Sequence, residues 1–163
     1  MPFANPLQIA VLGIGTFSKV TMVQIHGTHA AAGDEVYALK KMKKKVIETR
    51  KQTEHVMNEK TIMQEMRGHG FLLQLVTTFK DDNYIYMLLE LCQGGELFLR
   101  LLEEQVLSEN QTRFYAGCVV LALEGLHNSM NIYRDLKPEN LLLDTIGYVK
   151  IADLGFAKKV KDR

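Results

Sequence analysis

The 163-residue sequence predicts an α+β fold, with a strand-rich first part from about residue 8 to residue 91 and a helix-rich second part from about residue 92 to residue 163. Short apolar runs separated by glycine-containing or polar turns fill the first part, as is typical of an antiparallel sheet. Apolar residues recur at helical spacing in Thr53–Met66 and in Ser108–His127. These patterns predict one partial, two-lobed domain that spans residues 1–163.

Composition and charge argue against several classes of protein. The net charge of +1 gives no bulk field that would attract nucleic acid or an anionic membrane. No apolar run approaches the ~20 residues of a membrane-spanning helix, and Met1–Ala10 lacks the basic start and apolar core of a signal peptide. Cys92 and Cys118 lie in apolar runs and are too few for a disulfide framework, which predicts a reducing, cytoplasmic compartment.

In the first part, apolar runs predict strands at Ile9–Leu12, Lys19–Ile25 and Val36–Met42. A glycine turn follows the first strand, and the small, polar segment His26–Asp34 forms a loop after the second. The Thr53–Met66 helix ends at Gly68, because glycine interrupts helices. Two further apolar runs lie on either side of a polar turn and predict a strand pair: Leu72–Phe79 and Tyr84–Leu91.

In the second part, two glycines break the chain before a short predicted helix, Glu96–Leu102. Ser108 and Gln111 have the spacing of a capping box, so the long helix is expected to begin there and run to His127. Two apolar runs around a polar turn predict a hairpin: Leu141–Leu143 and Tyr148–Ile151. The apolar stripe of the long helix is interpreted as core packing: Tyr115, Cys118, Val119, Ala122 and Leu126.

The most informative motif is Tyr-Arg-Asp-Leu-Lys-Pro-Glu-Asn at residues 133–140, followed by Asp-Leu-Gly at residues 153–155. It matches the residue set of phosphoryl transfer. Asp135 is expected to accept or orient a substrate hydroxyl proton, and Lys137 to reach the transferred phosphate. Asn140 and Asp153 offer hard oxygen ligands that suit Mg²⁺. Asp135 alone could be an ordinary turn residue, but the whole pattern followed by an apolar hairpin argues against that interpretation.

A second set of residues predicts a phosphate-binding region in the first part. Gly13 and Gly15 lie between two strands, where their backbone amides can approach phosphates, although this signal is weak alone. The dinucleotide-binding fingerprint does not apply, because it must open a helix, and the P-loop sequence is absent. Lys40 ends an apolar strand and needs a counterion, which Glu59 can supply. By itself this pair could equally be two surface charges.

With these motifs in place, the chain resembles a eukaryotic protein kinase of the AGC group. The resemblance runs from about Gln8 to about Lys159, and it is greatest to the catalytic domains of cyclic-nucleotide-dependent kinases, those of the cGMP-dependent type before the cAMP-dependent type. Tyrosine before Arg134 and Asp135 is one AGC-like feature. The others are the segments at residues 54–60, 91–97, 113–118 and 155–159.

The resemblance implies roles for further residues. The glycine loop would contact the nucleotide through Leu12, Gly13, Gly15, Thr16, Phe17 and Ser18. Adenine would lie between Val20, Ala38, Leu142 and Leu12, and its edge would bond to the backbones of Glu90 and Cys92. Lys40 and Glu59 would clamp the inner phosphates. Glu96 would meet ribose or a basic substrate side chain, and Glu139 a substrate arginine. An internal spine would contain Met63, Leu75, Tyr133 and Leu154, with Leu89 as the gatekeeper.

The implied activity is transfer of the γ-phosphate of ATP, with Mg²⁺, to serine or threonine of protein substrates near basic residues. The alternative is a non-catalytic kinase fragment that binds nucleotide or partner proteins only. Two substitutions relative to the family pattern, Ser18 for glycine and Leu154 for phenylalanine, are expected to preserve function.

The sequence ends ten residues after Asp153. The resembled kinases continue into an activation loop and further helices, and they carry regulatory cyclic-nucleotide-binding domains that are absent from these residues. Residues 1–163 alone are therefore expected to expose the apolar face of the Ser108–His127 helix, to associate or bind a partner, and to show little kinase activity.

Overall fold

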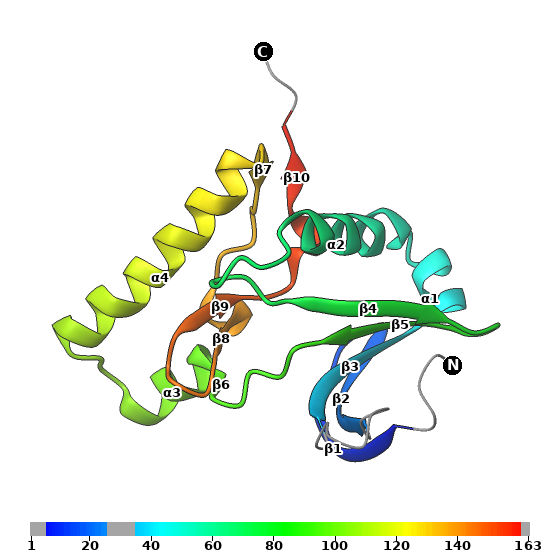
Figure 1. Ribbon diagram of the computed structural model, residues 1–163, viewed down its shortest axis with the longest axis horizontal. Helices are drawn as coiled ribbons and strands as arrows, with labels where there is room; N and C mark the ends of the chain where they lie inside the picture. The colour runs from blue at the N-terminus through cyan, green and yellow to red at the C-terminus, as the bar shows by residue number, and fades with distance from the viewer. Residues whose placement is uncertain (1–5, 26–34, 161–163) are drawn as a thin grey trace. The chain divides into compact units, whose positions relative to one another are not determined.

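The computed structural model describes residues 6–25 and 35–160. The chain forms two compact units (Figure 1): unit 1 comprises Met1–Thr53 and Leu75–Leu91, and unit 2 comprises Glu54–Gln74 and Cys92–Arg163. The loop expected at His26–Asp34 lies outside the described residues. The division into lobes at residue 91 remains a prediction.

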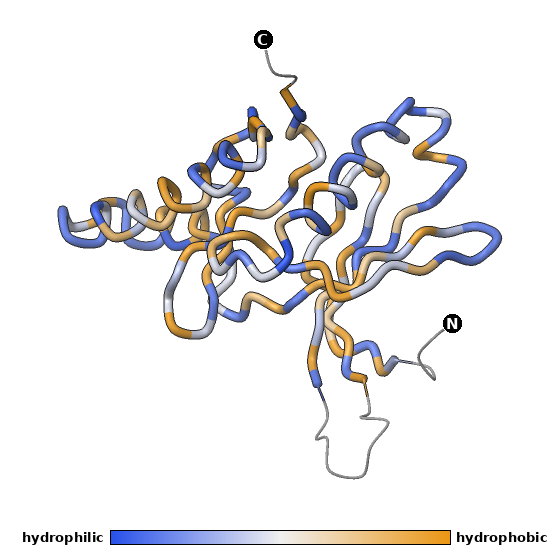
Figure 2. Tube along the Cα trace, turned by 45° about the horizontal axis from the view of Figure 1, so that its top comes forward, coloured by the Kyte–Doolittle hydropathy of each residue, from blue (hydrophilic) through white to orange (hydrophobic). Residues whose placement is uncertain are grey.

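Unit 1 contains an antiparallel five-stranded sheet with the strand order β1-β2-β3-β5-β4. This confirms the predicted fold class for the first part of the chain. The strands are β1 (Leu7–Ile14), β2 (Ser18–Ile25), β3 (Glu35–Lys43), β4 (Leu75–Lys80) and β5 (Tyr84–Leu89). Figure 2 shows hydrophobic residues along these strands and a hydrophilic turn between β4 and β5.

One face of this sheet forms an apolar cluster of alternating residues from neighbouring strands. Leu39 pairs with Leu88 across β3 and β5, and both are buried together with Val23 and Tyr86. Because side chains alternate between the two faces of a strand, Ala38 and Lys40 point to the opposite face from Leu39. The cluster therefore fixes which side of the sheet receives Lys40.

A short helix, α1 (Lys44–Thr49), follows β3 directly, where the sequence pattern predicts no element. The run of lysines suggested only a solvated surface. Ile47 is the exception, since its side chain is 3% exposed and anchors the helix to unit 1. Two adjacent apolar residues in six, Val46 and Ile47, give too little periodicity to be recognised as a helix.

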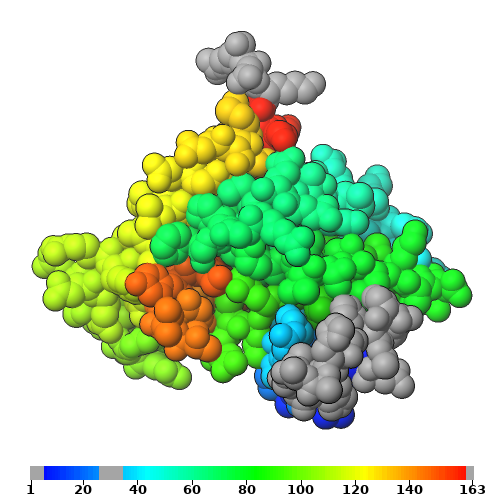
Figure 3. All heavy atoms as spheres, viewed as in Figure 1, coloured from blue at the N-terminus to red at the C-terminus, as the bar shows by residue number. Residues whose placement is uncertain are grey.

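Unit 2 combines helices with two small sheets. Its helices are α2 (Thr53–Glu65, whose first residue belongs to unit 1), α3 (Leu97–Glu104) and α4 (Glu109–Asn128). A three-stranded sheet contains β6 (Gly95–Glu96), β8 (Leu141–Leu143) and β9 (Val149–Ile151), and a two-stranded sheet pairs β7 (Asn131–Ile132) with β10 (Lys158–Lys159). Two 3-10 turns, η1 (Pro138–Asn140) and η2 (Leu154–Phe156), complete it. Figure 3 shows the orange β8–β9 region lying against the yellow-green α4.

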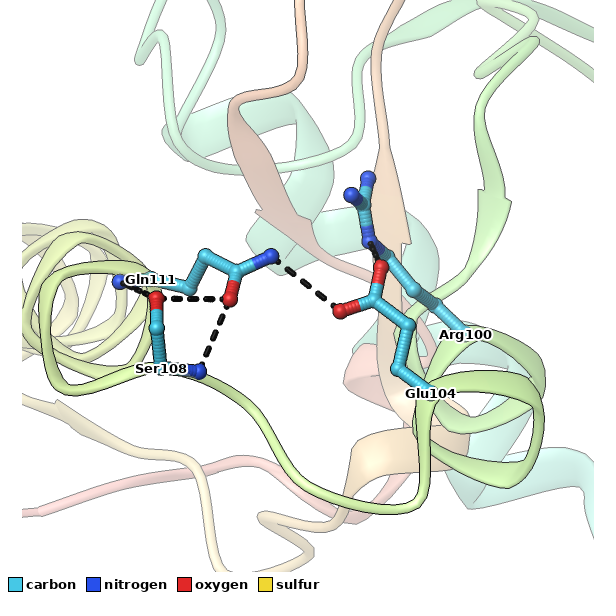
Figure 4. A network of polar contacts seen from close by, with 4 residues as sticks. All are labelled: Arg100, Glu104, Ser108 and Gln111. Atoms are coloured by element: carbon cyan, nitrogen blue, oxygen red, sulfur yellow. Dashed lines mark hydrogen bonds and ion pairs between the residues drawn. The ribbon is translucent and has the colours of Figure 1, made fainter.

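The helix predicted at Glu96–Leu102 begins one residue later, because Glu96 has extended backbone angles and pairs with Leu142 in the small sheet. The capping box at Ser108 is confirmed: its hydroxyl accepts from the Gln111 backbone amide, and the Gln111 side chain accepts from the Ser108 backbone amide. Figure 4 shows that Gln111 also donates to Glu104, which accepts in turn from Arg100. This network joins the end of α3 to the start of α4.

The inner face of α4 is buried, as its interpretation as core packing predicted, with Val119 half-buried. The expectation that residues 1–163 alone would expose this face is wrong, because β7 and β9 pack against the helix. Its fully or nearly buried residues are Tyr115, Cys118, Ala122 and Leu126. The opposite side exposes three large apolar side chains, Phe114, Val120 and Leu121. Over residues 6–25 and 35–160, no helix combines the length and the apolar character needed to span a membrane.

Candidate functional site

Three of the predicted catalytic residues form one hydrogen-bonded cluster in unit 2. Lys137 Nζ donates to Asp135 Oδ2 over 2.9 Å. Asn140 Nδ2 donates to the same carboxylate oxygen over 2.9 Å and to the Asp135 backbone carbonyl over 3.0 Å. The 3-10 turn η1 makes this possible, because it folds Asn140 back toward Asp135 within five residues. The cluster is thus built from a short stretch of chain.

The charges in this cluster support one another. The Lys137 ammonium, and then the Asn140 amide, lower the pKa of Asp135, while partial burial opposes the shift. Asp135 in turn raises the pKa of Lys137, which lies at the surface. Both residues therefore remain charged at neutral pH, with a carboxylate that can orient a hydroxyl and an ammonium that can face an anion.

The β8–β9 hairpin brings Asp153 to this cluster, although Asp153 lies thirteen positions after Asn140 in the sequence. Leu141 pairs with Ile151, and the Ala152 backbone amide donates to the Asn140 carbonyl over 2.8 Å. Asp153 follows immediately, in the left-handed region at φ 53° and ψ 69°. A residue other than glycine is uncommon there, and such conformations are concentrated at functional sites.

Tyr133 supports the cluster from inside the protein. Its side chain is 1% exposed, and its hydroxyl donates to the Ala152 carbonyl over 2.7 Å. Burial raises the pKa of Tyr133, and the Asn140 side chain opposes this shift in part. The nearby charges of Asp153, Asp135 and Glu59 raise the pKa further, so the hydroxyl remains protonated and able to donate. Tyr133 therefore links the loop at residues 133–140 to Ala152, the residue that precedes Asp153.

Replacing Tyr133 with phenylalanine is expected to lower the free energy of unfolding by about 1–2 kcal/mol, because the buried Ala152 carbonyl loses its donor. Urea unfolding followed by circular dichroism measures this change. Tyr148→Phe is the matched control, since that ring is 41% exposed and should tolerate the loss of its hydroxyl. Equal stabilities of the wild type and Tyr133→Phe would show that the hydrogen bond carries no net energy.

The donor atoms at Asn140 and Asp153 fit Mg²⁺. The Asn140 amide nitrogen already donates to both Asp135 oxygens described above, which leaves the amide oxygen as its ligand atom. Asp153 contributes an exposed carboxylate. Within the described residues, no group of three or more histidine, cysteine, aspartate or glutamate side chains could hold a metal ion. Magnesium commonly binds one or two protein oxygens together with substrate phosphates, so two ligands suit this ion.

In unit 1, three residues predicted to bind nucleotide form a row across neighbouring strands. Gly13 pairs with Val20, and Val20 pairs with Lys40. Residues directly opposite each other share one face of a sheet, so Lys40 and Val20 lie on the same face, together with Ala38 two residues earlier. The row supports the predicted grouping within this unit.

The glycine turn itself is tight. The Gly15 amide donates to the Ser18 carbonyl over 2.8 Å, and a Cβ at position 15 would lie 2.9 Å from Ser18 Oγ. Position 13 has open space around it. The turn therefore leaves room for a ligand near Gly13, whereas Ser18 fills the space next to Gly15. Ser18, in the place of the third glycine, thus takes part in the turn through its backbone carbonyl.

The remaining predicted residues divide between the two units. Glu90 belongs to unit 1, whereas Glu59, Cys92, Glu96, Glu139 and Leu142 belong to unit 2. Glu59 is buried on α2 at 4% exposure, and Glu96 pairs with Leu142 in the β6–β8 ladder. The proposed ion pair of Lys40 with Glu59 joins different units and remains a prediction.

Two supporting contacts could not be predicted from the sequence. Arg134 Nε donates to the Phe156 carbonyl over 2.9 Å, with Arg134 at φ 70°. Glu65, on α2, accepts from Lys159 and Asn131. The Arg134 contact has a backbone carbonyl as its acceptor, and every residue has such a group. The Glu65 contacts join residues that lie far apart in the chain. Neither leaves a pattern in the sequence.

Comparison with known proteins defines the class of protein. Residues 7–163 match the family described as "Protein kinase domain", so the chain belongs to the protein kinase family. Its fold, an antiparallel sheet followed by a helical part, agrees with this assignment.

Within that family, the chain is similar to cGMP-dependent protein kinases. It is 49% identical to cGMP-dependent protein kinase, isozyme 2 forms cD5/T2, of Drosophila melanogaster, over 94% of this chain and 16% of that protein. It is 45% identical to human cGMP-dependent protein kinase 2, over 98% of this chain and 20% of that protein. It is 43% identical to cGMP-dependent protein kinase egl-4 of Caenorhabditis elegans, over 96% of this chain and 19% of that protein. The chain thus spans a fifth or less of the length of these relatives.

Proposed function

We propose that the protein containing this chain is a serine/threonine protein kinase of the AGC type, which transfers the γ-phosphate of ATP to protein hydroxyl groups. The observation that carries the proposal is the cluster in which one carboxylate oxygen of Asp135 accepts from both Lys137 and Asn140. A carboxylate, a cation and an amide in one short loop are the groups that phosphoryl transfer needs. The similarity to cGMP-dependent protein kinases supports the same activity.

In the proposed reaction, Asp135 orients the substrate hydroxyl toward the phosphorus. Its lowered pKa makes it a weak base, so it accepts the hydroxyl proton late, when the bond to phosphorus has largely formed. Lys137 remains protonated and stabilises negative charge on the phosphate oxygens. Asn140 and Asp153 would hold Mg²⁺, which when bound neutralises phosphate charge.

The nucleotide would be bound by residues of both units. On the sheet face of unit 1, Lys40 would contact the inner phosphates and Val20 and Ala38 would offer an apolar surface. Gly13 and Gly15 would let the backbone approach the phosphates closely, since neither carries a side chain. From unit 2, Leu142 would contribute to the adenine surface and Glu59 would hold Lys40. The backbones of Glu90 and Cys92 would bond the adenine edge. A cytoplasmic location and cyclic-nucleotide regulation of the whole protein belong to the same proposal.

Two carboxylates support a preference for basic residues near the phosphoacceptor. Glu139 lies in the catalytic loop, and Glu96 lines a cavity of about 390 Å³ with residues of α3. Glu96 could instead serve only to begin α3, where an acidic residue suits the helix dipole. Its side chain makes no capping hydrogen bond, which favours a role toward a ligand over a role as a helix cap.

A peptide library phosphorylated by the full-length protein tests this preference. Peptides with arginine close to the serine should react at least about tenfold faster than alanine-substituted ones, through charge-assisted bonds to carboxylates. Glu96→Gln should reduce that ratio, whereas Glu109→Gln, on the exposed start of α4, should leave it unchanged. Equal rates for arginine and alanine peptides would reject the proposed substrate class.

An assay of phosphotransfer beside an assay of nucleotide binding tests the activity itself. The proposal predicts both, and it predicts that a Mg²⁺ chelator removes the phosphotransfer. Nucleotide binding without any phosphotransfer, over a broad set of serine and threonine peptides, would support a non-catalytic binding protein instead.

A further inference from the structure

The last residue of α2, Glu65, forms a polar junction with the two-stranded β7–β10 sheet of the same unit. Lys159 Nζ donates to Glu65 Oε1 over 2.8 Å, and Asn131 Nδ2 donates to Glu65 Oε2 over 3.3 Å. Lys159 and Asn131 are themselves paired across β10 and β7. One carboxylate therefore accepts from both strands of this sheet.

The buried amide of Asn131 makes this junction more than a surface ion pair. The Asn131 side chain is 0% exposed, and its nitrogen donates to the Ser129 carbonyl as well as to Glu65. If the amide nitrogen and oxygen exchanged places, the oxygen would face two acceptors, the Glu65 carboxylate and the Ser129 carbonyl. These two partners therefore fix the orientation of the Asn131 amide. The amide oxygen already lacks a hydrogen-bond partner among the described atoms. Removing Glu65 would deprive the same buried group of a further partner.

The other end of α2 contacts the segment that follows Asp153. The rings of His55 and Phe156 lie 4.8 Å apart, centroid to centroid. A Cβ on Gly155 would lie 3.6 Å from the His55 carbonyl, which is ordinary contact distance. The helix thus meets the chain from Gly155 to Lys159 at both of its ends. A rigid helix held at two points has little freedom to rotate or slide.

We propose that Glu65 is a positioning residue that fixes α2, and with it Glu59, against the segment following Asp153. Glu59 lies six residues before Glu65 on the same helix, roughly 9 Å along its axis. The consequence for catalysis rests on the proposed function, because Glu59 matters for phosphotransfer only if it holds Lys40. The structural part of the proposal does not depend on that function.

Amide hydrogen exchange in the full-length protein tests the structural part. Glu65→Ala should accelerate exchange in the last turn of α2 and in β10 by roughly fivefold or more, the scale of one lost ion pair and its supporting bond. Glu65→Gln keeps an acceptor for Asn131 and should show a smaller change. Lys159→Met should resemble Glu65→Ala, whereas Lys158→Met is the matched control. Lys158 is the neighbouring residue on the same strand, and its side chain points to the other side.

Steady-state kinetics of the same variants tests the positioning role. The proposal predicts that Glu65→Ala and Lys159→Met raise the KM for ATP and lower kcat by a few-fold, with partial recovery in Glu65→Gln and no change in Lys158→Met. Unchanged hydrogen exchange in Glu65→Ala would overturn the junction. Faster exchange with unchanged kcat and KM would overturn the positioning role alone. If Glu65→Ala exchanges faster but the wild-type protein transfers no phosphate, the result would contradict the proposed function and leave the junction supported.

Discussion

Replacing Asp135 with asparagine is expected to lower kcat for phosphotransfer by about 100-fold or more, with little change in ATP affinity. The lost group is the carboxylate that orients the substrate hydroxyl and accepts its proton, a contribution typically worth 10²–10⁴-fold in rate. Nucleotide binding should remain, because the proposed role of Asp135 is toward the substrate hydroxyl. Steady-state kinetics with a peptide substrate, together with calorimetric titration of ATP, separates these two effects.

The cluster around Asp135 should survive this substitution. An asparagine at position 135 has the same shape, and its amide oxygen can still accept from Asn140 and Lys137. Asp82→Asn, in the exposed turn between β4 and β5, is the control for loss of one negative charge. A kcat for Asp135→Asn close to that of the Asp82→Asn control would show that Asp135 is only a turn residue.

Replacing Lys40 with methionine should produce the second large effect, a loss of about 100-fold or more in phosphotransfer together with a higher KM for ATP. Methionine keeps much of the length of the side chain but removes the charge that would stabilise the inner phosphates, an electrostatic contribution of about 10²–10³-fold in comparable sites. Lys40 lies on the same sheet face as Val20, its partner on β2, and Val20 in turn pairs with Gly13 on β1.

Lys41 provides a matched control on the other face of β3. Its ammonium lies 3.9 Å from the centroid of the Tyr84 ring, a cation–π contact within unit 1. Lys41→Met should therefore reduce stability slightly, by about 0.5–1 kcal/mol, and leave phosphotransfer intact. Equal turnover in Lys40→Met and Lys41→Met would mean that Lys40 is an ordinary surface lysine.

The elements that the sequence predicts well are those with strong local patterns. The strands of unit 1 are apolar runs between turns, and the capping box at Ser108 and Gln111 marks the start of α4. Elements with weak patterns were missed or displaced. A lysine run obscured α1, and the two-residue strands β7 and β10 are too short to show any periodicity.

The same distinction holds for the candidate site. Asp135, Lys137 and Asn140 could be grouped from the sequence because five residues of chain cannot carry them far apart. Asp153 could be added to this group because the β8–β9 hairpin brings the chain after Ile151 back beside Leu141, the residue that follows Asn140. The Asn131–Glu65 contact joins residues 66 positions apart and depends on how α2 packs against the small sheet. No local rule predicts such a contact.

The most direct test of the central claim is a single experiment with the full-length protein, γ-labelled ATP, Mg²⁺ and a serine peptide flanked by arginine residues. The account predicts labelled phosphoserine from the wild type and almost none from Asp135→Asn, although both bind ATP. Equal labelling by the two proteins, or ATP binding by the wild type with no labelled peptide, would contradict the claim that this loop carries phosphoryl transfer.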